Sequence, residues 1–300
     1  MGLPIDINNK FPHEIYEGVE YKDFWKGMGK IKLDELEQYL VRDLLPASGL
    51  RLIDLGCGYG RLSDCYMKRF KTTVLFDGSL SLLQQAREKT KGGGVYIAGN
   101  IDHSPFKRGS FDAALMVRVF HHIRDSRRCL TEINRILGIN GVLVLNYSNK
   151  GNISRIIHWV FNRKNENPLT LDPKLDNPWF YQHHPTYIHH LLSDIGFTEL
   201  ESRGAGMVDK IAERLGPLGI YLPDGRRIAR ISGKLKIAPW IFCSAKSTNS
   251  QPIIPGDQIE DLLQCPSCNG DLSCEINIYT CKKCYKKYPV IDEIIDFRIP

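Results

Sequence analysis

A β-rich run that leads into three alternating glycines, LIDLGCGYGRL at residues 52–62, constrains this chain more than any other feature. Glycine at these positions permits a tight turn and lets a ligand approach the backbone without a Cβ in the way. The next β-rich run ends at Asp77, about 20 residues further on, where a carboxylate can accept hydrogen bonds from both hydroxyls of a ribose. Together these features predict a strand–turn–helix unit that holds an adenosine-containing cofactor.

From about residue 50 onward, β-rich runs alternate with helical patterns, which is typical of βαβ units that build a parallel sheet. The predicted strands span 51–55, 72–77, 95–99, 112–117, 141–147, 197–204 and 237–246. Helical patterns lie between them, for example at 81–89 and 126–137, the second capped by Asp125 or Ser126. The sequence therefore predicts an α/β fold with a Rossmann-like, seven-stranded, mostly parallel sheet and helices on both faces.

Breaks in this pattern divide the chain. Residues 1–247 form one large domain, in which the less regular stretch at about 150–190 is interpreted as a lid-like insertion on the substrate side. Ser, Asn, Pro and Gly replace periodic apolar residues at 248–258, which predicts a linker. Residues 259–300 then form a small second module, which we call the ribbon.

Composition limits the partners and the compartment. The start of the chain has no apolar run behind a basic cluster, and about 18 consecutive uncharged apolar residues occur nowhere, so we expect neither a signal peptide nor a membrane span. Residues 1–250 hold 35 Lys and Arg against 26 Asp and Glu, whereas the remainder holds 5 against 8. Attraction for anionic partners therefore belongs to the large domain. The nine cysteines are interpreted as thiols and metal ligands of a cytoplasmic protein.

A dinucleotide-binding loop is the obvious rival interpretation of the glycines. Such a loop reads GxGxxG, but Arg61 occupies the position of its third glycine, and the actual pattern is GxGxG preceded by Asp54. An acid before the loop suits the ammonium group of a methionine moiety and would repel a pyrophosphate. The spacing thus favours a methionine-derived cofactor.

Four blocks, in order over about residues 45–150, resemble class I S-adenosylmethionine-dependent methyltransferases, particularly the ubiquinone and menaquinone methyltransferase group. They are LIDLGCGYG, the acid in LFDGS, GNIDHSPFKRGSFDAALMVRVFHHIRD and RILGINGVLVLN. The resemblance implies S-adenosyl-L-methionine as cofactor. It assigns Asp54 and the glycines Gly56, Gly58 and Gly60 to the methionine end, and Asp77 to the ribose.

The same resemblance assigns adenine binding to the third block. Asn100 stands where the family often has an Asp that accepts from the adenine amine, and an Asn carbonyl can accept as well, while the Ile101 N–H could reach the ring. Val117 and Arg118 follow the fourth strand and should lie near the sulfonium. Because a cation there would repel a sulfonium, Arg118 is expected to point outward or to hold an anionic substrate.

Methyl transfer from a sulfonium is an in-line displacement, so alignment supplies much of the acceleration and a base is optional. His122 is the first candidate for that base, ahead of His121 and of the lid residues His183 and His184. A histidine that is packed or hydrogen-bonded at the strand end remains the plain alternative for His121 and His122. For His183 and His184 the plain alternative is a solvated loop histidine. The segment MVRVFHH replaces the NPPY and Pro-Cys motifs of amino- and pyrimidine-methylating enzymes, which leaves oxygen, carboxylate or activated-carbon acceptors.

Two CxxC pairs stand near the end of the chain, Cys265 with Cys268 and Cys281 with Cys284, separated by twelve residues. Four thiolates at this spacing can close a tetrahedral structural zinc site, with Cys274 as an uninvolved thiol. Residues 259–300 resemble the small zinc-ribbon activator protein that partners tRNA, rRNA and release-factor methyltransferases. That likeness implies a fused docking or stabilising role.

The leading functional hypothesis is methyl transfer to a small-molecule or lipid-linked acceptor. The alternative is a tRNA, rRNA or translation-factor methyltransferase with a fused activator, motivated by the ribbon and by basic residues at 226–236. A third class is a scaffold or lipid-surface protein, because NISRIIHWVFNRK is basic and amphipathic and could make a peripheral membrane contact. Helices of that kind more often pack into a core.

Overall fold

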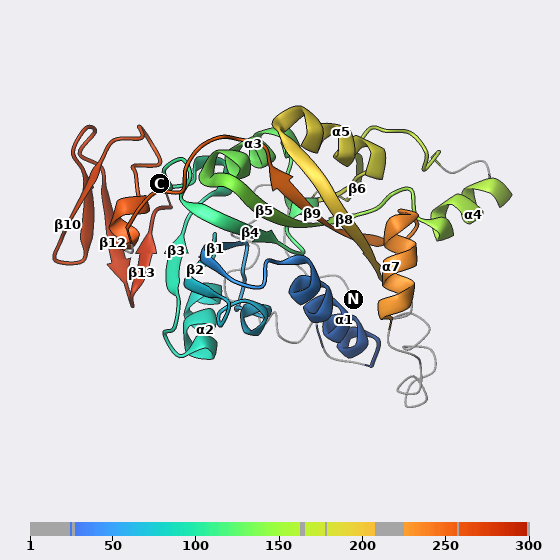
Figure 1. Cartoon of the computed structure of the whole chain (residues 1–300), viewed down its shortest axis with the longest axis horizontal. Helices are drawn as coiled ribbons and strands as arrows, with labels where there is room; N and C mark the ends of the chain where they lie inside the picture. The colour runs from blue at the N-terminus through green and yellow to red at the C-terminus, as the bar shows by residue number, and fades with distance from the viewer. Residues whose placement is uncertain are drawn as a thin grey trace.

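The computed structural model describes Trp25 and residues 28–162, 166–177, 179–207, 225–256 and 258–298. A twisted sheet runs through the molecule, with the ribbon at one end and α4 and α7 at the other (Figure 1). The helices are α1 (Met28–Leu44), α2 (Leu80–Thr90), α3 (Ser126–Ile136), α4 (Ile153–Phe161), α5 (Pro185–Ile195) and α7 (Arg226–Lys234), with short 3-10 turns η3 (Ser63–Cys65), η4 (Ile101–His103), η5 (Phe120–His122) and η7 (Ile259–Leu262).

The large domain contributes parallel strands in its centre and an antiparallel pair at one edge. Its main strands are β1 (Gly49–Leu55), β2 (Phe70–Asp77), β3 (Val95–Ala98), β4 (Phe111–Met116), β5 (Leu137–Ser148), β8 (Phe197–Ala205) and β9 (Trp240–Ser247). They lie in the order β3-β2-β1-β4-β5-β9-β8, in which β9 runs antiparallel to both of its neighbours. This arrangement confirms the Rossmann-like α/β prediction.

Within the described part of the chain the sheet has eleven strands, so the predicted count of seven is wrong. The ribbon supplies four more, namely β10 (Leu272–Glu275), β11 (Ile278–Cys281), β12 (Lys287–Ile291) and β13 (Ile294–Asp296). The last of these pairs in parallel with β3, from Ile294 beside Tyr96 to Asp296 beside Ala98. The open edge of β3 offers unpaired backbone groups, and β13 satisfies them. The ribbon therefore docks on its own chain.

Alternating side chains of β1 separate the two faces of the sheet. Leu52 packs in one cluster with Val41 of α1, whereas Ile53 packs in another with Leu130 of α3. The period of two follows from strand geometry, and it places helices on both faces as expected. Asp125 accepts a hydrogen bond from the Arg128 N–H at 3.0 Å, which identifies it as the N-cap of α3.

The segment predicted to be a linker is held against the large domain. Arg51, only 2% exposed, donates to the carbonyls of Ile254 and Gly256. The Ile139 N–H donates to the carbonyl of Gln251 at 2.6 Å. These bonds fix the path of the chain between the large domain and the ribbon.

The lid contains α4, α5 and a separate hairpin of β6 (Lys174–Asn177) and β7 (Phe180–Gln182). The first 24 residues, on which the expectation of no signal peptide rests, lie outside the described residues, as do residues 163–165 and 178 of the lid. Among the helices that are described, none combines the length and apolarity needed to cross a bilayer.

Candidate functional site

The glycine loop follows β1 directly, and each glycine has a positive φ: 75° at Gly56, 54° at Gly58 and 74° at Gly60. A Cβ on Gly56 would lie 2.3 Å from a methyl carbon of Val119, so packing as well as backbone conformation requires glycine there. A Cβ on Gly58 would have no described neighbour within 4 Å. The backbone at Gly58 therefore faces open space that a ligand can occupy.

Asp77 ends β2 beside this loop. Its carboxylate accepts from the Gly58 N–H at 2.8 Å and from the Ser79 N–H at 2.9 Å. Ser79 in turn caps α2 by accepting from the Leu82 N–H. Each carboxylate oxygen has a further lone pair, so Asp77 can still accept from the two hydroxyls of a ribose.

Asp54 lies at the end of β1 and is only 3% exposed. The Tyr66 hydroxyl donates to its carboxylate at 2.7 Å. Burial raises the pKa of Asp54 to about 7, which the Tyr66 hydrogen bond opposes and the negative charge of Asp77 assists. An ammonium group placed here would favour the ionised carboxylate.

If Asp54 holds the ammonium group of the cofactor, this titration is expected to make cofactor binding depend on pH. Because Asp54 must be ionised to attract an ammonium, the affinity for S-adenosylhomocysteine is expected to fall about tenfold per pH unit below the pKa and to level off above it. Tyr66→Phe removes a donor that favours the charged form, so its profile should move to higher pH. Isothermal titration between about pH 6 and 8 measures both.

Tyr147→Phe is the matched control, since the buried Tyr147 hydroxyl has no hydrogen-bond partner among the described residues. Its profile should coincide with that of the wild type. An affinity that does not change with pH in the wild type would contradict a role for Asp54 in holding the ammonium.

The residues assigned to adenine follow β3. Asn100 is exposed, and its side-chain oxygen accepts from the Asp102 N–H at 2.9 Å, so it caps η4. Ile101 is half-buried against the core. Strand register places Asp77 beside Ala98, two residues before Asn100. The predicted ribose and adenine positions therefore share one edge of the sheet with the glycine loop.

Val117, which the resemblance assigns to the surroundings of the sulfonium, is buried after β4. Arg118 does not point outward, because its side chain is only 13% exposed. Its Nε donates to Glu37 at 2.8 Å, and its guanidinium lies 3.6 Å over the ring of Trp240. Glu37, not a substrate, neutralises this cation.

Glu37 of α1 is a residue that sequence reasoning missed. It is fully buried and also accepts from Arg61 at 2.7 Å, so it joins the glycine loop to the end of β4. Burial alone would raise the pKa of Glu37, but the guanidiniums of Arg118 and Arg61 outweigh it and hold that pKa below its usual value. Loss of the carboxylate would leave Arg118 without an ion-pair partner among the described residues, whereas Arg61 would keep Asp34. No local sequence signal distinguishes Glu37 from the other acids of its helix.

Four aromatic side chains meet where η5, β7 and β9 converge, and we call them the acceptor-side cluster: His121, His122, Phe180 and Trp240. The ring of His121 lies 4.0 Å from that of His122 and 4.5 Å from that of Phe180, and it packs edge-on against Trp240. Burial, with neighbouring positive groups, holds the pKa of His121 well below its usual value. His121 is thus a packing residue of this cluster.

His122 has a defined hydrogen bond. Its Nδ1 lies 2.7 Å from the Trp179 carbonyl, an acceptor, so Nδ1 carries the proton and Nε2 is left as the basic nitrogen. Burial lowers its pKa despite this bond, which keeps the ring neutral near pH 7. His183, by contrast, is fully buried against Ser126 with a pKa lowered to about 4, and is not the solvated lid histidine that the sequence suggested.

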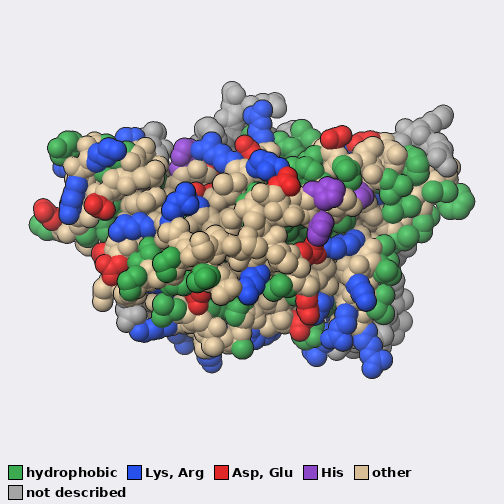
Figure 2. Space-filling view, turned by 45° about the horizontal axis from the view of Figure 1, so that its top comes forward, with side chains coloured by type: hydrophobic (Ala, Val, Ile, Leu, Met, Phe, Trp, Pro, Cys, Tyr) green, Lys and Arg blue, Asp and Glu red, His purple; other side chains and the backbone are tan. Residues whose placement is uncertain are grey.

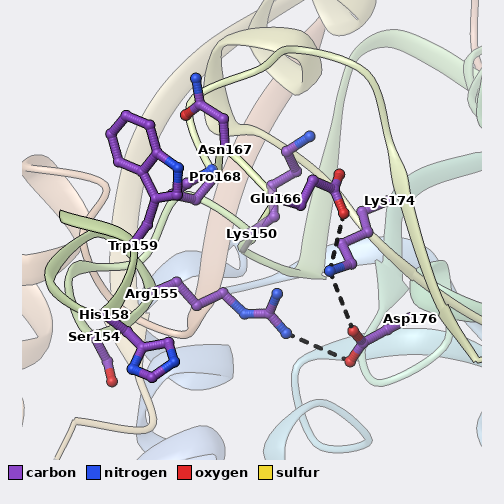
Figure 3. A pocket seen from close by; sticks show the side chains of 10 residues that line it. All are labelled: Lys150, Ser154, Arg155, His158, Trp159, Glu166, Asn167, Pro168, Lys174 and Asp176. Carbon is purple, nitrogen blue, oxygen red and sulfur yellow. Dashed lines mark hydrogen bonds and ion pairs between the residues drawn. The ribbon is translucent and has the colours of Figure 1, made fainter. Parts of the chain in front are cut away.

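A pocket of about 440 Å³ opens within the lid (Figure 3). Lys174 lies between Glu166 at 3.0 Å and Asp176 at 3.9 Å, and Arg155 approaches Asp176 at 3.4 Å. The buried Lys150 donates to the Thr170 hydroxyl at 2.8 Å. The ion pairs among Arg155, Glu166, Lys174 and Asp176 thus hold the hairpin against α4.

The ribbon cysteines come together as predicted. The sulfurs of Cys265, Cys268, Cys281 and Cys284 all lie within 4.8 Å of one another, with the closest pairs at 3.5 and 3.6 Å. A Zn–S distance of about 2.3 Å in a tetrahedron separates the sulfurs by about 3.8 Å, so the cluster fits zinc. A Cβ on Gly270 would reach 3.0 Å from the Cys281 sulfur, which explains the glycine. Cys274 is exposed and outside the cluster.

Part of this chain is similar in sequence to known methyltransferases. Residues 53–145 match the family model described as a methyltransferase domain. A demethylmenaquinone methyltransferase of Thermobifida fusca is 29% identical over 102 residues, which cover 33% of this chain and 43% of that protein. Three such curated relatives are matched over only 41–43% of their length. The chain thus matches less than half the length of each of these curated relatives.

Solved structures of methyltransferases align with most of this chain. A complex between the Haloferax volcanii Trm112 methyltransferase activator and a methyltransferase has a chain that aligns with a TM-score of 0.52 at 17% identity, covering 74% of this chain and 94% of that chain. Magnesium protoporphyrin IX methyltransferase from Synechocystis, solved with bound S-adenosylhomocysteine, aligns with a TM-score of 0.54 at 12% identity, covering 78% and 97%. At these identities the comparison shows a shared methyltransferase fold.

Proposed function

We propose that this chain is an S-adenosylmethionine-dependent methyltransferase. The observation that carries the proposal is the pairing of Gly58, open to a ligand, with the Asp77 carboxylate 2.8 Å away at the end of the neighbouring strand. A loop that served only as a turn would not need open space beside Gly58. The match of residues 53–145 to a methyltransferase domain supports the same activity.

The residues present fit the cofactor from end to end. Asp54 would hold the methionine ammonium, with Gly56, Gly58 and Gly60 letting the chain approach, and Asp77 would hold the ribose. Asn100 and the Ile101 N–H would bind the adenine, and Val117 would pack near the sulfonium. The cofactor supplies an electrophilic methyl group, and the chain contributes by fixing its orientation, because alignment is the main requirement of an in-line transfer.

We assign the acceptor to the acceptor-side cluster, and its class to small molecules or lipid-linked compounds. The flat rings of Phe180 and Trp240 suit an acceptor with apolar or conjugated surface. The likeness to a demethylmenaquinone methyltransferase supports this class. His122, neutral and with Nε2 unprotonated, is proposed as the base that receives the proton of an oxygen or carbon acceptor.

His122→Ala is therefore expected to lower turnover by about 10²–10⁴-fold, the usual contribution of a positioned base, without weakening cofactor binding. Turnover is measured on the acceptor once identified, and cofactor affinity by titration. His190→Ala, which removes an exposed histidine of α5, serves as the control. Unchanged turnover in His122→Ala would leave His122 as a packing residue.

The activity itself is tested by incubating the full chain with cofactor labelled in its methyl group and a fractionated cell extract. Label in the small-molecule or lipid fraction supports the proposal. Label in tRNA, rRNA or a translation factor would favour the second candidate, a modifying enzyme with a fused activator. The similarity to a methyltransferase solved with the Trm112 activator is the observation behind that candidate.

The remaining assignments follow from the cysteines and the chain path. We propose that Cys265, Cys268, Cys281 and Cys284 bind one structural zinc, that residues 1–247 and 259–300 are the two domains, and that 248–258 joins them. We place the protein in the cytoplasm, because zinc-ligating thiols persist in a reducing compartment.

A further inference from the structure

Helix α4 exposes apolar side chains that no described part of the chain covers. None of its residues is buried, and Phe161 is 87% exposed, Ile157 50% and Val160 48%. Isolated exposed apolar residues are ordinary, but three on one short helix form a patch. The amphipathic stretch identified in the sequence is therefore not a core helix.

The two faces of α4 explain this exposure. Ser154, Arg155, His158 and Trp159 line the lid pocket, and Arg155 pairs with Asp176 there (Figure 3). Ile157, Val160 and Phe161 fall at other positions of the helical turn. Polar and charged contacts hold the helix to the protein, and its apolar side is left outward.

Helix α7 presents a second exposed surface of the same mixed kind. Its buried residues are the small Ala229, Ser232 and Gly233, which pack against the sheet. Its outer side carries Ile231, 62% exposed, and Leu235 just beyond its end, 61% exposed. Small residues inside and large apolar residues outside reverse the usual pattern of a core-packed helix.

Cations surround these apolar residues. Arg227, Arg230 and Lys234 are exposed, and none forms an ion pair with any residue that the structure describes. The helix contains no acidic residue at all. Figure 2 shows hydrophobic side chains gathered over α4 and Lys and Arg side chains over α7 at the same end of the molecule.

The two helices are adjacent, since the Ile153 N–H at the start of α4 donates to the carbonyl of Ile237, just after α7, at 3.0 Å. We define the α4–α7 face as Ile157, Val160 and Phe161 with Arg227, Arg230, Ile231, Lys234 and Leu235. It lies at the end opposite the ribbon (Figure 1). Any partner of this face must accept both apolar side chains and positive charge.

We propose that the α4–α7 face docks the protein on an anionic lipid bilayer. Apolar side chains of an amphipathic helix enter the interfacial region while Lys and Arg meet the phosphate groups. RNA would pair with the cations but would leave Phe161 and Val160 in water. Arg227, Arg230 and Lys234, which form no ion pair with a described residue, thus fit a negatively charged membrane surface. This docking is separate from methyl transfer and does not require it.

The test is sedimentation of the full chain with vesicles of phosphatidylcholine, either pure or mixed with phosphatidylglycerol. Binding is expected to the anionic vesicles, to weaken as salt is raised, and to be at least tenfold weaker to pure phosphatidylcholine. The paired substitutions Ile157→Ser with Phe161→Ser, and Arg227→Gln with Arg230→Gln, should each reduce binding at least tenfold. All four side chains are exposed, so these changes spare the core.

Matched controls lie on the ribbon, at the other end of the molecule. Ile276→Ser removes an apolar side chain that is 96% exposed, and Lys282→Gln with Lys283→Gln removes two exposed cations. Both should bind vesicles like the wild type. Failure of the wild type to sediment with anionic vesicles, or undiminished binding by both α4–α7 variants, would overturn the proposal. So would retention by RNA without retention by vesicles.

Cofactor titration of the same variants separates the two proposals. Vesicle binding by a protein that binds no S-adenosylhomocysteine would leave the docking proposal standing and refute the methyltransferase. Cofactor binding by a wild type that does not sediment would do the reverse.

Discussion

Asp77→Ala is expected to weaken binding of S-adenosylhomocysteine by at least about 100-fold. The carboxylate is assigned two hydroxyl donors of the ribose, and a hydrogen bond to a charged group contributes about 1.5–3 kcal/mol. Two such bonds correspond to about 10²–10⁴ in affinity, because about 1.4 kcal/mol is tenfold. The variant also loses the bonds that hold Gly58 and Ser79 in place. Isothermal titration at pH 8, where Asp54 is ionised, measures the loss.

Two further variants make this result specific. Asp77→Asn keeps one acceptor oxygen without the charge, so its affinity should lie between those of Asp77→Ala and the wild type. Glu88→Ala removes an exposed acid of α2 and changes the net charge equally, yet should bind as the wild type does. Equal affinities in all of these proteins would show that the ribose is held elsewhere, and would remove the main support for the proposed function.

Much of the large domain could be predicted because its signals are local. The strand that ends at Leu55, the positive-φ glycines after it and the cap at Asp125 each depend on a few neighbouring residues. A parallel sheet then brings the ends of its strands to one edge, which places Asp77 and Asn100 beside the glycine loop. The spacing of apolar residues and the residue types at turns and caps are enough to predict such features.

Contacts between distant segments could not be predicted. Glu37 pairs with Arg61 and Arg118, so a buried carboxylate on the first helix decides where the Arg118 side chain goes. The position of His183 in a loop likewise favoured a solvated side chain, yet tertiary packing places it against Ser126. In each case the partner lies more than twenty residues away along the chain. The sequence around the residue therefore does not indicate which partner it contacts.

The predicted number of strands in the sheet was wrong for the same reason. β13 is a short strand, Ile294–Asp296, and its three residues could pair with many different strand edges. Only the free edge of β3 determines that it extends the central sheet. Phe297 then donates its N–H to the Ala98 carbonyl at 2.7 Å and packs in the core, so the ribbon contributes to the strand that precedes Asn100.

Because β13 of the ribbon pairs with β3, loss of the zinc site should affect cofactor binding as well as the ribbon. Cys281→Ser is expected to abolish zinc binding, seen by native mass spectrometry, and to unfold the ribbon at a temperature where the wild type is folded. About 40 residues bury too little apolar surface to fold alone, and structural zinc contributes about 10–16 kcal/mol in small peptides. Because β13 then no longer supports β3, the affinity for S-adenosylhomocysteine should fall as well, unlike that of a protein whose ribbon is an independent appendage.

Cys274→Ser supplies the matched control, since Cys274 is an exposed thiol of the same ribbon outside the cluster. It should keep the zinc, the melting temperature and the cofactor affinity of the wild type. Zinc retained in Cys281→Ser would refute the four-thiolate site. Zinc lost with cofactor affinity intact would instead confine the metal to the ribbon, and β3 would then hold Asn100 and Ile101 in place without β13. The two readouts thus distinguish a ribbon that binds metal only for itself from one that completes the cofactor edge of the sheet.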